Sequence, residues 1–556
     1  MYALQKLKKE IASSLGCDEN ELSKPPEGSG DISSSAAFRI AKEQKKNPKQ
    51  AADELVSKAK KPAMISNVKS VGPYINFFID YQSFSQRVLE ESTEKNYGSS
   101  DAGKNKAITI DYSSPNIAKP FGVGHLRSTV IGQSIYNLNS FIGYNCVGIN
   151  HLGDWGLQFG KLLYAYKRWG DRKKIEKDPI KELLKLYVRF HKETEKNKDL
   201  EGHAIEEFRK LEEKDQENTL LWKWFSDLSL QDFKKVYVRL GVSFDKIEGE
   251  SHYALSDETK KVVEEAIRKK VAVTEPTGAV IIPLEKYGLA NARLLENGRT
   301  LYVTRDIAAA EDRHKKYNFS KNIYVVGSEQ KMHFQQLFKS LELLGYEWSQ
   351  DCVHVPFGLI SFEGEKMSTR EGRVIFLEDV LDKAVAKAEK IINEKNPSIK
   401  NKKKAAEIIG IGAVKFADLS QNRVKDIVFD WDKMISFEGD TAPYLQYAYV
   451  RCKSILEKAK KCNQFKVPGE LEYDEKKVVM RLSEFPDVVM QAATHYEPHV
   501  LANYLLALVH EYSSFYEKCK VIGSENEAFR LKIVEATANV LRIGLGLLGI
   551  GVIEEM

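Results

Sequence analysis

Cysteine is scarce in this 556-residue chain and is never clustered. The six cysteines form no Cys-x-x-Cys pair, which argues against a disulfide framework and against a cysteine-based zinc site. His495 and His499 have the spacing of two metal ligands on one helical face, but Pro498 lies between them and no third ligand follows. We therefore predict that the protein has no metal site built from its own side chains.

Long apolar runs are also absent. The longest weakly apolar run, residues 543–553, is interrupted by glycines and is shorter than the roughly 18 residues that a membrane-spanning helix needs. Residues 1–16 carry lysines between their apolar positions, instead of the continuous apolar core of a signal peptide. These absences predict a soluble cytoplasmic protein without a membrane partner.

A strong charge of either sign is missing as well. The 84 Lys and Arg residues nearly balance the 79 Asp and Glu residues, so the net charge neither supports nor excludes a nucleic-acid partner. The apolar share of 42% and the charged share of 29% exclude a wholly disordered or collagen-like chain. At about 100–200 residues per domain, the length predicts three or four domains.

Three regions differ in pattern and together predict an α/β multidomain protein. Residues 1–95 mix short helical patterns with a strand-like sequence, which predicts a small α/β domain. The polar, Gly- and Ser-rich residues 92–107 predict a linker. Residues 436–556 carry apolar stripes at helical spacing and predict an all-helical bundle. Between them, residues 103–435 predict the largest domain.

This central region has the pattern of a parallel sheet with helical insertions. A strand at 107–113, a helix that includes Leu126 and a strand at 144–151 follow one another, as at the start of a parallel sheet. A charged helical insertion is predicted from about residue 173 to residue 240. Further strand patterns follow at residues 279–284, 300–306, 322–328 and 354–362.

The junction between the first strand and its helix has the residues of a phosphate-binding turn. Residues 113–129 read SSPNIAKPFGVGHLRST. Gly122 and Gly124 would let the backbone approach a ligand closely. His125 would offer a ring N–H from the first helical turn, and Lys119 would add a positive charge. Taken alone, the segment is equally well interpreted as an ordinary turn with a surface lysine.

A second polar segment, residues 363–373, reads EGEKMSTREGR. Lys366, Arg370 and Arg373 would suit a loop that closes on a polyphosphate. A tripeptide such as Lys-Met-Ser also arises by chance. On its own, the segment is better interpreted as a solvated charged hairpin.

Together and in this order, the two segments resemble the signature motifs of class I aminoacyl-tRNA synthetases. Longer strings are similar to those of the arginyl-tRNA synthetase family, among them HLGDWGLQFG at 151–160, LYVTRDIAAA at 301–310 and VGSEQKMHFQQLF at 326–338. The similarity includes GDISSSAAFRIAK at 30–42 and YLQYAYVRCKSIL at 444–456, and so covers nearly the whole chain. The resemblance implies a Rossmann-like catalytic domain, an N-terminal domain that contacts tRNA and a C-terminal anticodon-binding bundle.

The resemblance also implies an activity, that of an arginine–tRNA ligase. Arginine and ATP would form arginyl-adenylate and pyrophosphate. The arginyl group would then pass to the 2′-hydroxyl of the terminal adenosine of tRNA(Arg). Mg²⁺ is expected to bind mainly through the nucleotide, and the protein is expected to be a monomer.

The family's functional residues carry over to matching positions of this sequence. The expected catalytic residues are Lys119, His125, Lys366 and Arg370. The expected ATP-binding residues are Gly122, Gly124, His125, Met367 and Ser368. The expected arginine-binding residues are Asp111, Asn116, His151, Asp154, Tyr302, Asp306 and Gln330. The expected tRNA-binding residues are Tyr444, Gln446, Tyr447 and Arg451. Of these, Asp306 is expected at a strand end facing the guanidinium, whereas Asp111 and Asn116 face the amino and carboxylate end.

Two positions depart from the usual class I pattern. Gly122 stands where the first motif usually has a histidine, and Thr369 stands where the second motif usually has its second lysine. In the family, the lysine at the position of Lys119 is thought to supply the missing charge. Gly122 leaves open a catalytically weakened paralogue that binds tRNA. A nucleotidyltransferase acting on another acceptor is a third alternative, and the helical C-terminal region counts against it.

Overall fold

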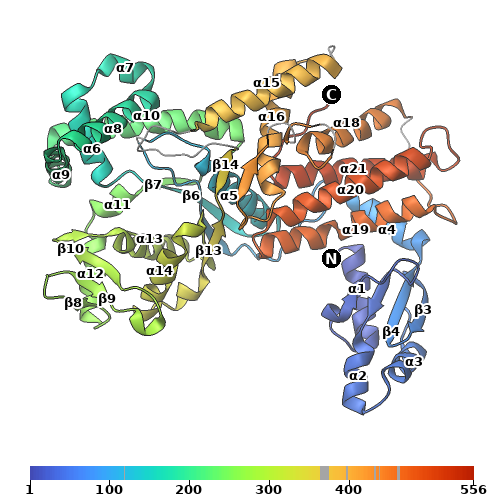
Figure 1. Ribbon diagram of the computed structural model, residues 1–556. Helices are drawn as coiled ribbons and strands as arrows, with labels where there is room; N and C mark the ends of the chain where they lie inside the picture. The colour runs from blue at the N-terminus through green and yellow to red at the C-terminus, as the bar shows by residue number, and fades with distance from the viewer. Residues whose placement is uncertain are drawn as a thin grey trace.

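The computed structural model describes residues 1–117, 119–362, 375–395, 399–430, 434–436, 439–459 and 464–555. Figure 1 shows a small N-terminal unit, a central α/β region with helical and mixed extensions on one side, and a C-terminal group of helices on the other. The predicted class, a parallel-sheet core with a small N-terminal unit and a helical C-terminal region, is confirmed.

The N-terminal unit is a four-stranded antiparallel sheet covered by helices. Its strands have the order β1-β2-β4-β3, and they are β1 Leu22–Ser23, β2 Ile32–Ser34, β3 Ile65–Val71 and β4 Tyr74–Ile79. Its helices are α1 Ala3–Leu15, α2 Ala36–Gln44, α3 Pro48–Lys58 and α4 Tyr81–Ser92. The unit lies next to the C-terminal helix α19 (Figure 1).

The segment predicted to be a linker, residues 92–107, is instead packed against the C-terminal region. Tyr97 is only 1% exposed, and its hydroxyl donates a hydrogen bond to the carbonyl oxygen of Leu482 at 2.9 Å. Its ring stacks on Phe485, with 5.8 Å between the centroids. Gly98 follows at a φ of +87°. The polar composition around Tyr97 hides this single aromatic anchor, which is why the linker prediction is wrong.

The central sheet has five parallel strands in the order β13-β12-β5-β6-β7. They are β5 Ala107–Asp111, β6 Asn145–Leu152, β7 Lys246–Gly249, β12 Lys321–Gly327 and β13 Cys352–Phe357. Helix α5 (Gly124–Phe141) connects β5 to β6. From β5 the chain first adds strands on one side and later returns to add β12 on the other. A parallel sheet binds its ligands outside the carboxyl ends of the strands at such a reversal.

A helical insertion separates β6 from β7, as the sequence predicts. Its helices are α6 Leu157–Trp169, α7 Arg172–Lys177, α8 Pro179–Lys196, α9 Asp199–Glu212 and α10 Gln216–Leu240. The long helix α10 brings the chain back to the sheet, where the hydroxyl of Tyr237 contacts Ser113 just beyond β5 at 2.8 Å.

A second extension lies between β7 and β12 and has a hydrophobic core of its own. It contains an antiparallel sheet of β8 Val273–Thr274, β9 Val280–Ile282, β10 Ala292–Glu296 and β11 Arg299–Thr300. Its helices are α11 Glu250–Ala254, α12 Glu258–Arg268 and α13 Tyr302–Tyr317, and α14 Lys331–Leu343 follows β12.

The strand predicted at 300–306 is wrong, because β11 ends at Thr300 and helix α13 begins at Tyr302. The alternation in TLYVTRD is too short to decide between strand and helix. Val303, Ile307 and Ala310 continue at helical spacing and are buried. The pattern at 354–362 is divided between β13 and β14 (Ile360–Phe362), which pairs with β15 (Ile427–Phe429).

The remaining helices form the C-terminal region. They are α15 Leu377–Lys395, α16 Lys402–Leu419, α18 Ala442–Lys458, α19 Tyr473–Thr494, α20 Pro498–Lys518 and α21 Glu527–Leu547. Within the described ranges, no helix is both long and apolar enough to cross a membrane.

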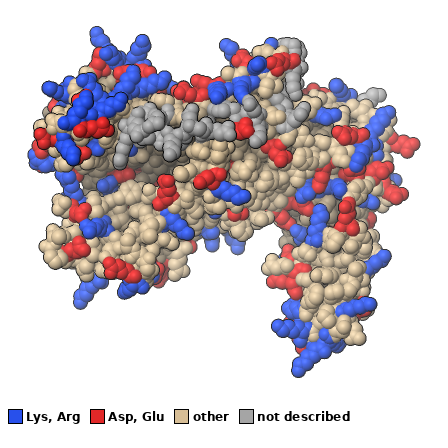
Figure 2. Space-filling view, in the orientation of Figure 1, with Lys and Arg blue, Asp and Glu red and all other residues tan. Residues whose placement is uncertain are grey.

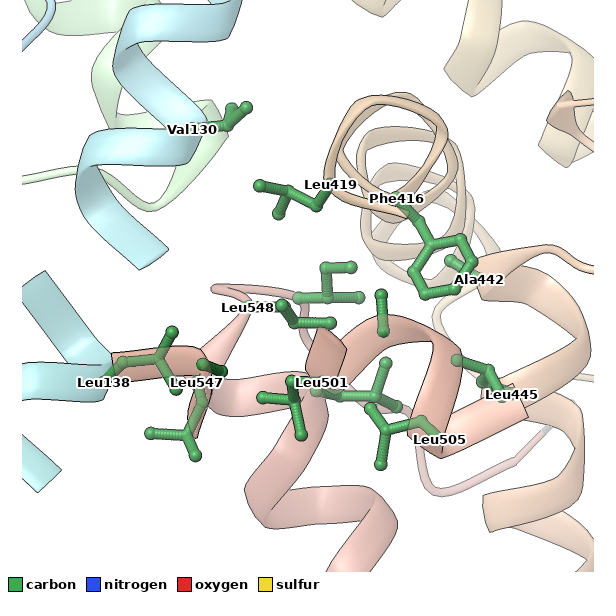
Figure 3. Packing of buried hydrophobic residues seen from close by; sticks show 14 of the residues in the cluster. Val130, Leu138, Phe416, Leu419, Ala442, Leu445, Leu501, Leu505, Leu547 and Leu548 are labelled. Carbon is green, nitrogen blue, oxygen red and sulfur yellow. The ribbon is translucent and has the colours of Figure 1, made fainter. Parts of the chain in front are cut away.

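Helix α5 and the end of the chain share one hydrophobic core. Figure 3 shows side chains of α5, α16, α18, α20 and the residues at the end of α21 meeting there, among them Leu138, Leu419, Leu445, Leu505 and Leu547. Polar contacts add to it, since Ser134 of α5 donates to the carbonyl oxygen of Leu547 at 3.2 Å. The ammonium of buried Lys415 donates to the carbonyl oxygens of Leu240 and Gly549. The C-terminal helices are therefore continuous with the sheet region.

Candidate active site

The predicted phosphate-binding turn lies between the carboxyl end of β5 and the start of α5 at Gly124. The backbone of Asn116 pairs with Gly153, and that of Gly122 pairs with Phe376. The hydroxyl of Ser128 accepts the N–H of Ser113 at 2.9 Å, which holds the beginning of the turn on the helix. The turn is thus fixed at both ends, beside the carboxyl edge of the sheet.

His125 occupies the first turn of α5, as predicted. Its ring stacks on Phe121 with 5.3 Å between the centroids, and its Nδ1 is buried without a hydrogen-bond partner among the described residues. Burial, together with the charge of Lys119, lowers the pKa of His125 to about 4. The imidazole is therefore neutral near pH 7 and can donate one N–H to a ligand. The ammonium of Lys119 lies 5.9 Å above the ring of Tyr187 in the helical insertion.

Asp111 ends β5 and is held by an arginine that the sequence did not single out. Its Oδ2 accepts a hydrogen bond from Nη2 of Arg313 at 2.6 Å, and its Oδ1 accepts one from Ser114 at 2.8 Å. Both charged side chains are almost fully buried. Arg313 lies seven residues after Asp306 on α13, so the two share one helical face. That spacing is the one sequence signal that could have indicated Arg313.

Asp306 lies within helix α13 rather than at a strand end, but it is buried beside the same edge of the sheet. Its Oδ2 lies 2.6 Å from Nε2 of His333, which α14 contributes and which the sequence analysis missed. The ring of Tyr302 lies 4.7 Å from that of His333, and Tyr302 is 46% exposed. Tyr302 is therefore partly exposed beside Asp306 and His333 and is not a core aromatic. Gln330 is exposed and directly precedes α14, three positions before His333 in the sequence.

Glu250 is a further carboxylate that the sequence analysis missed. It begins α11, and Arg305 donates a hydrogen bond to it. Burial and the nearby charge of Asp306 outweigh Arg305 and raise the pKa of Glu250 to about 7. The group therefore changes its charge near neutral pH.

His151 and Asp154 follow β6 and differ in what they offer. The carboxylate of Asp154 accepts the N–H of Ser251 at 2.8 Å and its hydroxyl at 2.6 Å, so both oxygens are already engaged in holding α11. The ring nitrogens of His151 are buried and have no partner among the described residues. Burial lowers the pKa of His151. The negative charge of Asp111 raises this pKa, and the positive charge of Arg313 lowers it. Each oxygen of Asp154 thus already accepts a hydrogen bond within the protein, whereas the buried ring nitrogens of His151 have their hydrogen-bonding capacity unused among the described residues.

These groups cluster near the carboxyl edge of the sheet, at its reversal, and have the chemistry of a candidate cation-binding site. Its carboxylates exceed its guanidinium groups by two when all are ionised, the members being Asp111, Asp154, Glu250 and Asp306 against Arg305 and Arg313. Excess negative charge in a largely buried site favours a ligand with positive charges.

The four predicted tRNA-binding residues lie on α18 and divide by exposure. Gln446 is fully buried, and its amide donates to the carbonyl oxygen of Gly551 at 2.7 Å. This interior position contradicts the prediction that Gln446 binds tRNA. Its side chain instead joins α18 to the end of the chain. Tyr444 is half-buried, Tyr447 is 44% exposed, and the guanidinium of Arg451 lies 4.0 Å above the ring of Tyr516. The predicted residues Lys366, Met367, Ser368 and Arg370 lie outside the described residues.

The sequence and the fold have close counterparts among known proteins. Residues 87–431 match the family model "tRNA synthetases class I (R), catalytic domain". Residues 445–556 match the DALR anticodon binding domain, and residues 3–79 match the arginyl tRNA synthetase N terminal domain. The parallel sheet, the turn at His125 and the match over residues 87–431 define a class I tRNA synthetase.

Similar proteins indicate which family of class I tRNA synthetases the chain belongs to. An arginine–tRNA ligase of Halothermothrix orenii is 47% identical over 528 residues, covering 93% of this chain and 92% of that protein. One of Clostridium botulinum is 46% identical over 531 residues and covers 93% of both. The Thermus thermophilus arginyl-tRNA synthetase structure aligns with a TM-score of 0.84 at 25% identity, covering 99% of this chain and all of that one. The chain belongs to the arginyl-tRNA synthetase family.

Proposed function

We propose that this protein joins arginine to tRNA(Arg) at the expense of ATP. In the first step a carboxylate oxygen of arginine attacks the α-phosphorus of ATP, and the bond to pyrophosphate breaks. In the second step the 2′-hydroxyl of the terminal adenosine attacks the arginyl carbonyl, and AMP leaves. The observation that carries the proposal is the cluster of buried carboxylates near the first-motif turn, because such a cluster suits a cationic substrate close to a phosphate-binding turn.

The pocket has the chemistry that arginine requires. The arginyl part of the adenylate has two positive charges, on the guanidinium and the α-amino group, which matches the excess of two carboxylates. We assign the guanidinium to Asp306, Tyr302 and Glu250. We assign the α-amino end to Asp111 and Asn116. A site built for a planar fork of N–H donors should reject lysine, because its acceptors would be left unpaired.

The phosphate side depends on the turn before α5. Neutral His125 can donate to a phosphate oxygen, and Gly124 has no neighbouring atom within 4 Å of an added Cβ, so a ligand can approach there. Lys119 adds a positive charge. Lys366, Ser368 and Arg370 remain candidates for the β- and γ-phosphates, and Met367 remains a candidate for ATP binding. Neither step needs a covalent enzyme intermediate, so the protein acts by alignment and by stabilising developing charge.

Mg²⁺ belongs to the nucleotide in this proposal. Among the described residues there is no group of three or more His, Cys, Asp or Glu side chains arranged to hold a metal ion. A protein that uses Mg²⁺ with ATP usually leaves most of its coordination to phosphates and water. When bound, the ion would neutralise phosphate charge.

For tRNA, Tyr444, Tyr447 and Arg451 remain candidates on α18, where bases can stack on aromatic and guanidinium planes. Figure 2 shows Lys and Arg side chains gathered over the helical insertion. The exposed members on α7 are Arg172, Lys173, Lys174 and Lys177. Such a surface attracts phosphates in a salt-dependent manner.

Arginine-dependent exchange of pyrophosphate into ATP, with and without tRNA, tests the proposal. Exchange with arginine but not lysine is expected, and its absence under all conditions would contradict an active ligase. Gly122 favours one alternative, a weakened paralogue, because a missing charged hydrogen bond costs about 1.5–3 kcal/mol, or about ten- to a hundredfold in rate. Gly122→His therefore belongs in the same experiment, and activity found only in that variant would support the paralogue.

A further inference from the structure

Arg127 and Asp418 form an ion pair in the interior of the protein. Nε of Arg127 lies 3.0 Å from Oδ1 of Asp418, and both side chains are 0% exposed. Arg127 belongs to α5, three residues into the helix from Gly124, and Asp418 belongs to α16. Buried pairs of this kind contribute little net stability, because desolvation of the charges offsets their attraction. Stability alone therefore does not explain the pair.

The guanidinium of Arg127 also fixes two backbone segments. Its Nη1 donates to the carbonyl oxygen of Gly358 at 2.7 Å and to that of Lys425 at 2.8 Å. These residues lie two positions before the first residues of the paired strands β14 and β15. The two segments are in close contact. The N–H of Gly358 donates to the carbonyl oxygen of Arg423 at 2.9 Å. A Cβ added to Gly358 would lie 2.6 Å from the carbonyl oxygen of Lys425. One side chain thus connects α5, α16 and both strands.

The chain that returns after residue 374 is fixed to the same turn. The N–H of Val123 donates to the carbonyl oxygen of Ile375 at 3.1 Å, and the N–H of Leu377 donates to that of Phe121 at 3.0 Å. Together with Arg127, these bonds place the described chain on either side of residues 363–374 against the first-motif turn.

We propose that Arg127, held by Asp418, is a positioning residue for ATP: it sets the register between the first-motif turn on α5 and strand β14. Arg127 does not touch the nucleotide in this proposal. It acts through the backbone of Gly358 and Lys425, and displacement of reacting groups by about 1 Å can reduce a rate by about a hundredfold. The inference rests on the proposed function, since it concerns the adenylation step.

The test replaces the pair with apolar residues of similar volume, Arg127→Met with Asp418→Leu, in the full chain. The matched control is Arg530→Met with Glu475→Leu, another buried pair at 2.7 Å, which lies between C-terminal helices. Thermal unfolding is measured first, because the double replacement avoids an unpaired buried charge. Arg127→Lys is measured alongside, since it keeps the charge but loses the planar fork.

Pyrophosphate exchange then gives separate KM values for ATP and arginine. We expect kcat/KM for ATP to fall at least about tenfold in the first double variant, with the KM for arginine changed less than about threefold, and with Arg127→Lys intermediate. The control should keep the parent's values. Unchanged ATP kinetics, an equal rise in the KM values for ATP and arginine, or the same loss in the control would overturn the inference.

Failure of the proposed function can be distinguished from failure of the inference about Arg127. A parent chain without exchange would contradict that function, and titration with ATP would then decide the inference on its own. Weaker ATP binding in the Arg127→Met, Asp418→Leu variant, but not in the control, would support it, and equal binding would overturn it.

Discussion

At the scale of single residues, the pocket is defined by pairs that the sequence does not display. Asp306 contacts His333, Asp111 contacts Arg313, and Glu250 contacts Arg305. Each pair joins residues from different elements, and only the helical spacing between Asp306 and Arg313 gives a hint of one partner, Arg313. Motif similarity located the carboxylates of two of these pairs, Asp306 and Asp111. It could not locate the partners, because they are determined by packing of α11, α13 and α14 against the sheet.

Asp306→Asn should impair arginine recognition. The substitution keeps the size but removes the charge that we propose faces the guanidinium, and a hydrogen bond to a charged group is worth about 1.5–3 kcal/mol. We expect the KM for arginine to rise about ten- to a hundredfold, with the KM for ATP and the affinity for tRNA nearly unchanged. Steady-state exchange and a tRNA binding assay measure this. An unchanged KM for arginine would show that Asp306 does not face the guanidinium.

Glu250 predicts a pH dependence of arginine binding. Because burial raises the pKa of Glu250 to about 7, the group is largely protonated at pH 6 and largely ionised at pH 8. A guanidinium binds better to the ionised form, so the affinity for arginine should rise with pH across this window and binding should release protons. Titrations at pH 6, 7 and 8 measure the change. Glu250→Gln should bind more weakly and lose the dependence, and an identical pH profile in that variant would assign the titration elsewhere.

At the scale of elements, strands and helices were predictable where a pattern was long. The strands β5, β6 and β12, the insertion and the C-terminal helices follow from periodicity. The segment 300–306 failed because seven residues fit both a strand and the start of α13. Tyr302 and Asp306 were nevertheless brought to the site, since the first turns of α13 and the carboxyl ends of the strands meet at the same edge. Function was therefore easier to predict than the local backbone.

Lys119→Ala should slow adenylate formation more than it weakens arginine binding. Lys119 precedes α5, and its ammonium is proposed to act on phosphates rather than on the amino acid. We expect kcat for exchange to fall about tenfold or more, with the KM for arginine changed less than about threefold. Lys185→Ala is the control, because Lys185 is exposed on α8 and pairs with Glu182. An unaffected rate would remove the proposed compensation for Thr369.

At the scale of the whole molecule, the N-terminal unit is anchored through residues that composition had indicated to be flexible. Tyr97 and Gly98 lie against α19, and this contact was unpredictable because its partners are almost four hundred positions away in the sequence. Long-range packing of this kind leaves no local pattern. The order of the three regions was predictable from sequence, whereas their mutual contacts were not.

Gly98→Ala should destabilise this anchor. An added Cβ would lie 2.7 Å from the ring of Phe485, at a φ of +87°. We expect a loss of about 1–3 kcal/mol in the free energy of unfolding, measured by denaturant titration. Gly72→Ala is the matched control, since Gly72 has a φ of +60° but no atom within 4 Å of its added Cβ. Equal losses in the two variants would mean that backbone strain alone, and not the contact with Phe485, determines the cost.

The shared core of α5 and the end of the chain has a consequence for biosynthesis. Ser134 of α5 bonds to Leu547, and Lys415 of α16 bonds to Gly549, so neither helix can complete its contacts until the ribosome has released residues near 550. Domains usually fold in order as they emerge. Here the nascent catalytic region stays partly exposed until helix α21 has been synthesised. A chain stopped shortly before residue 547 should therefore be a substrate for chaperones and proteases rather than a working enzyme.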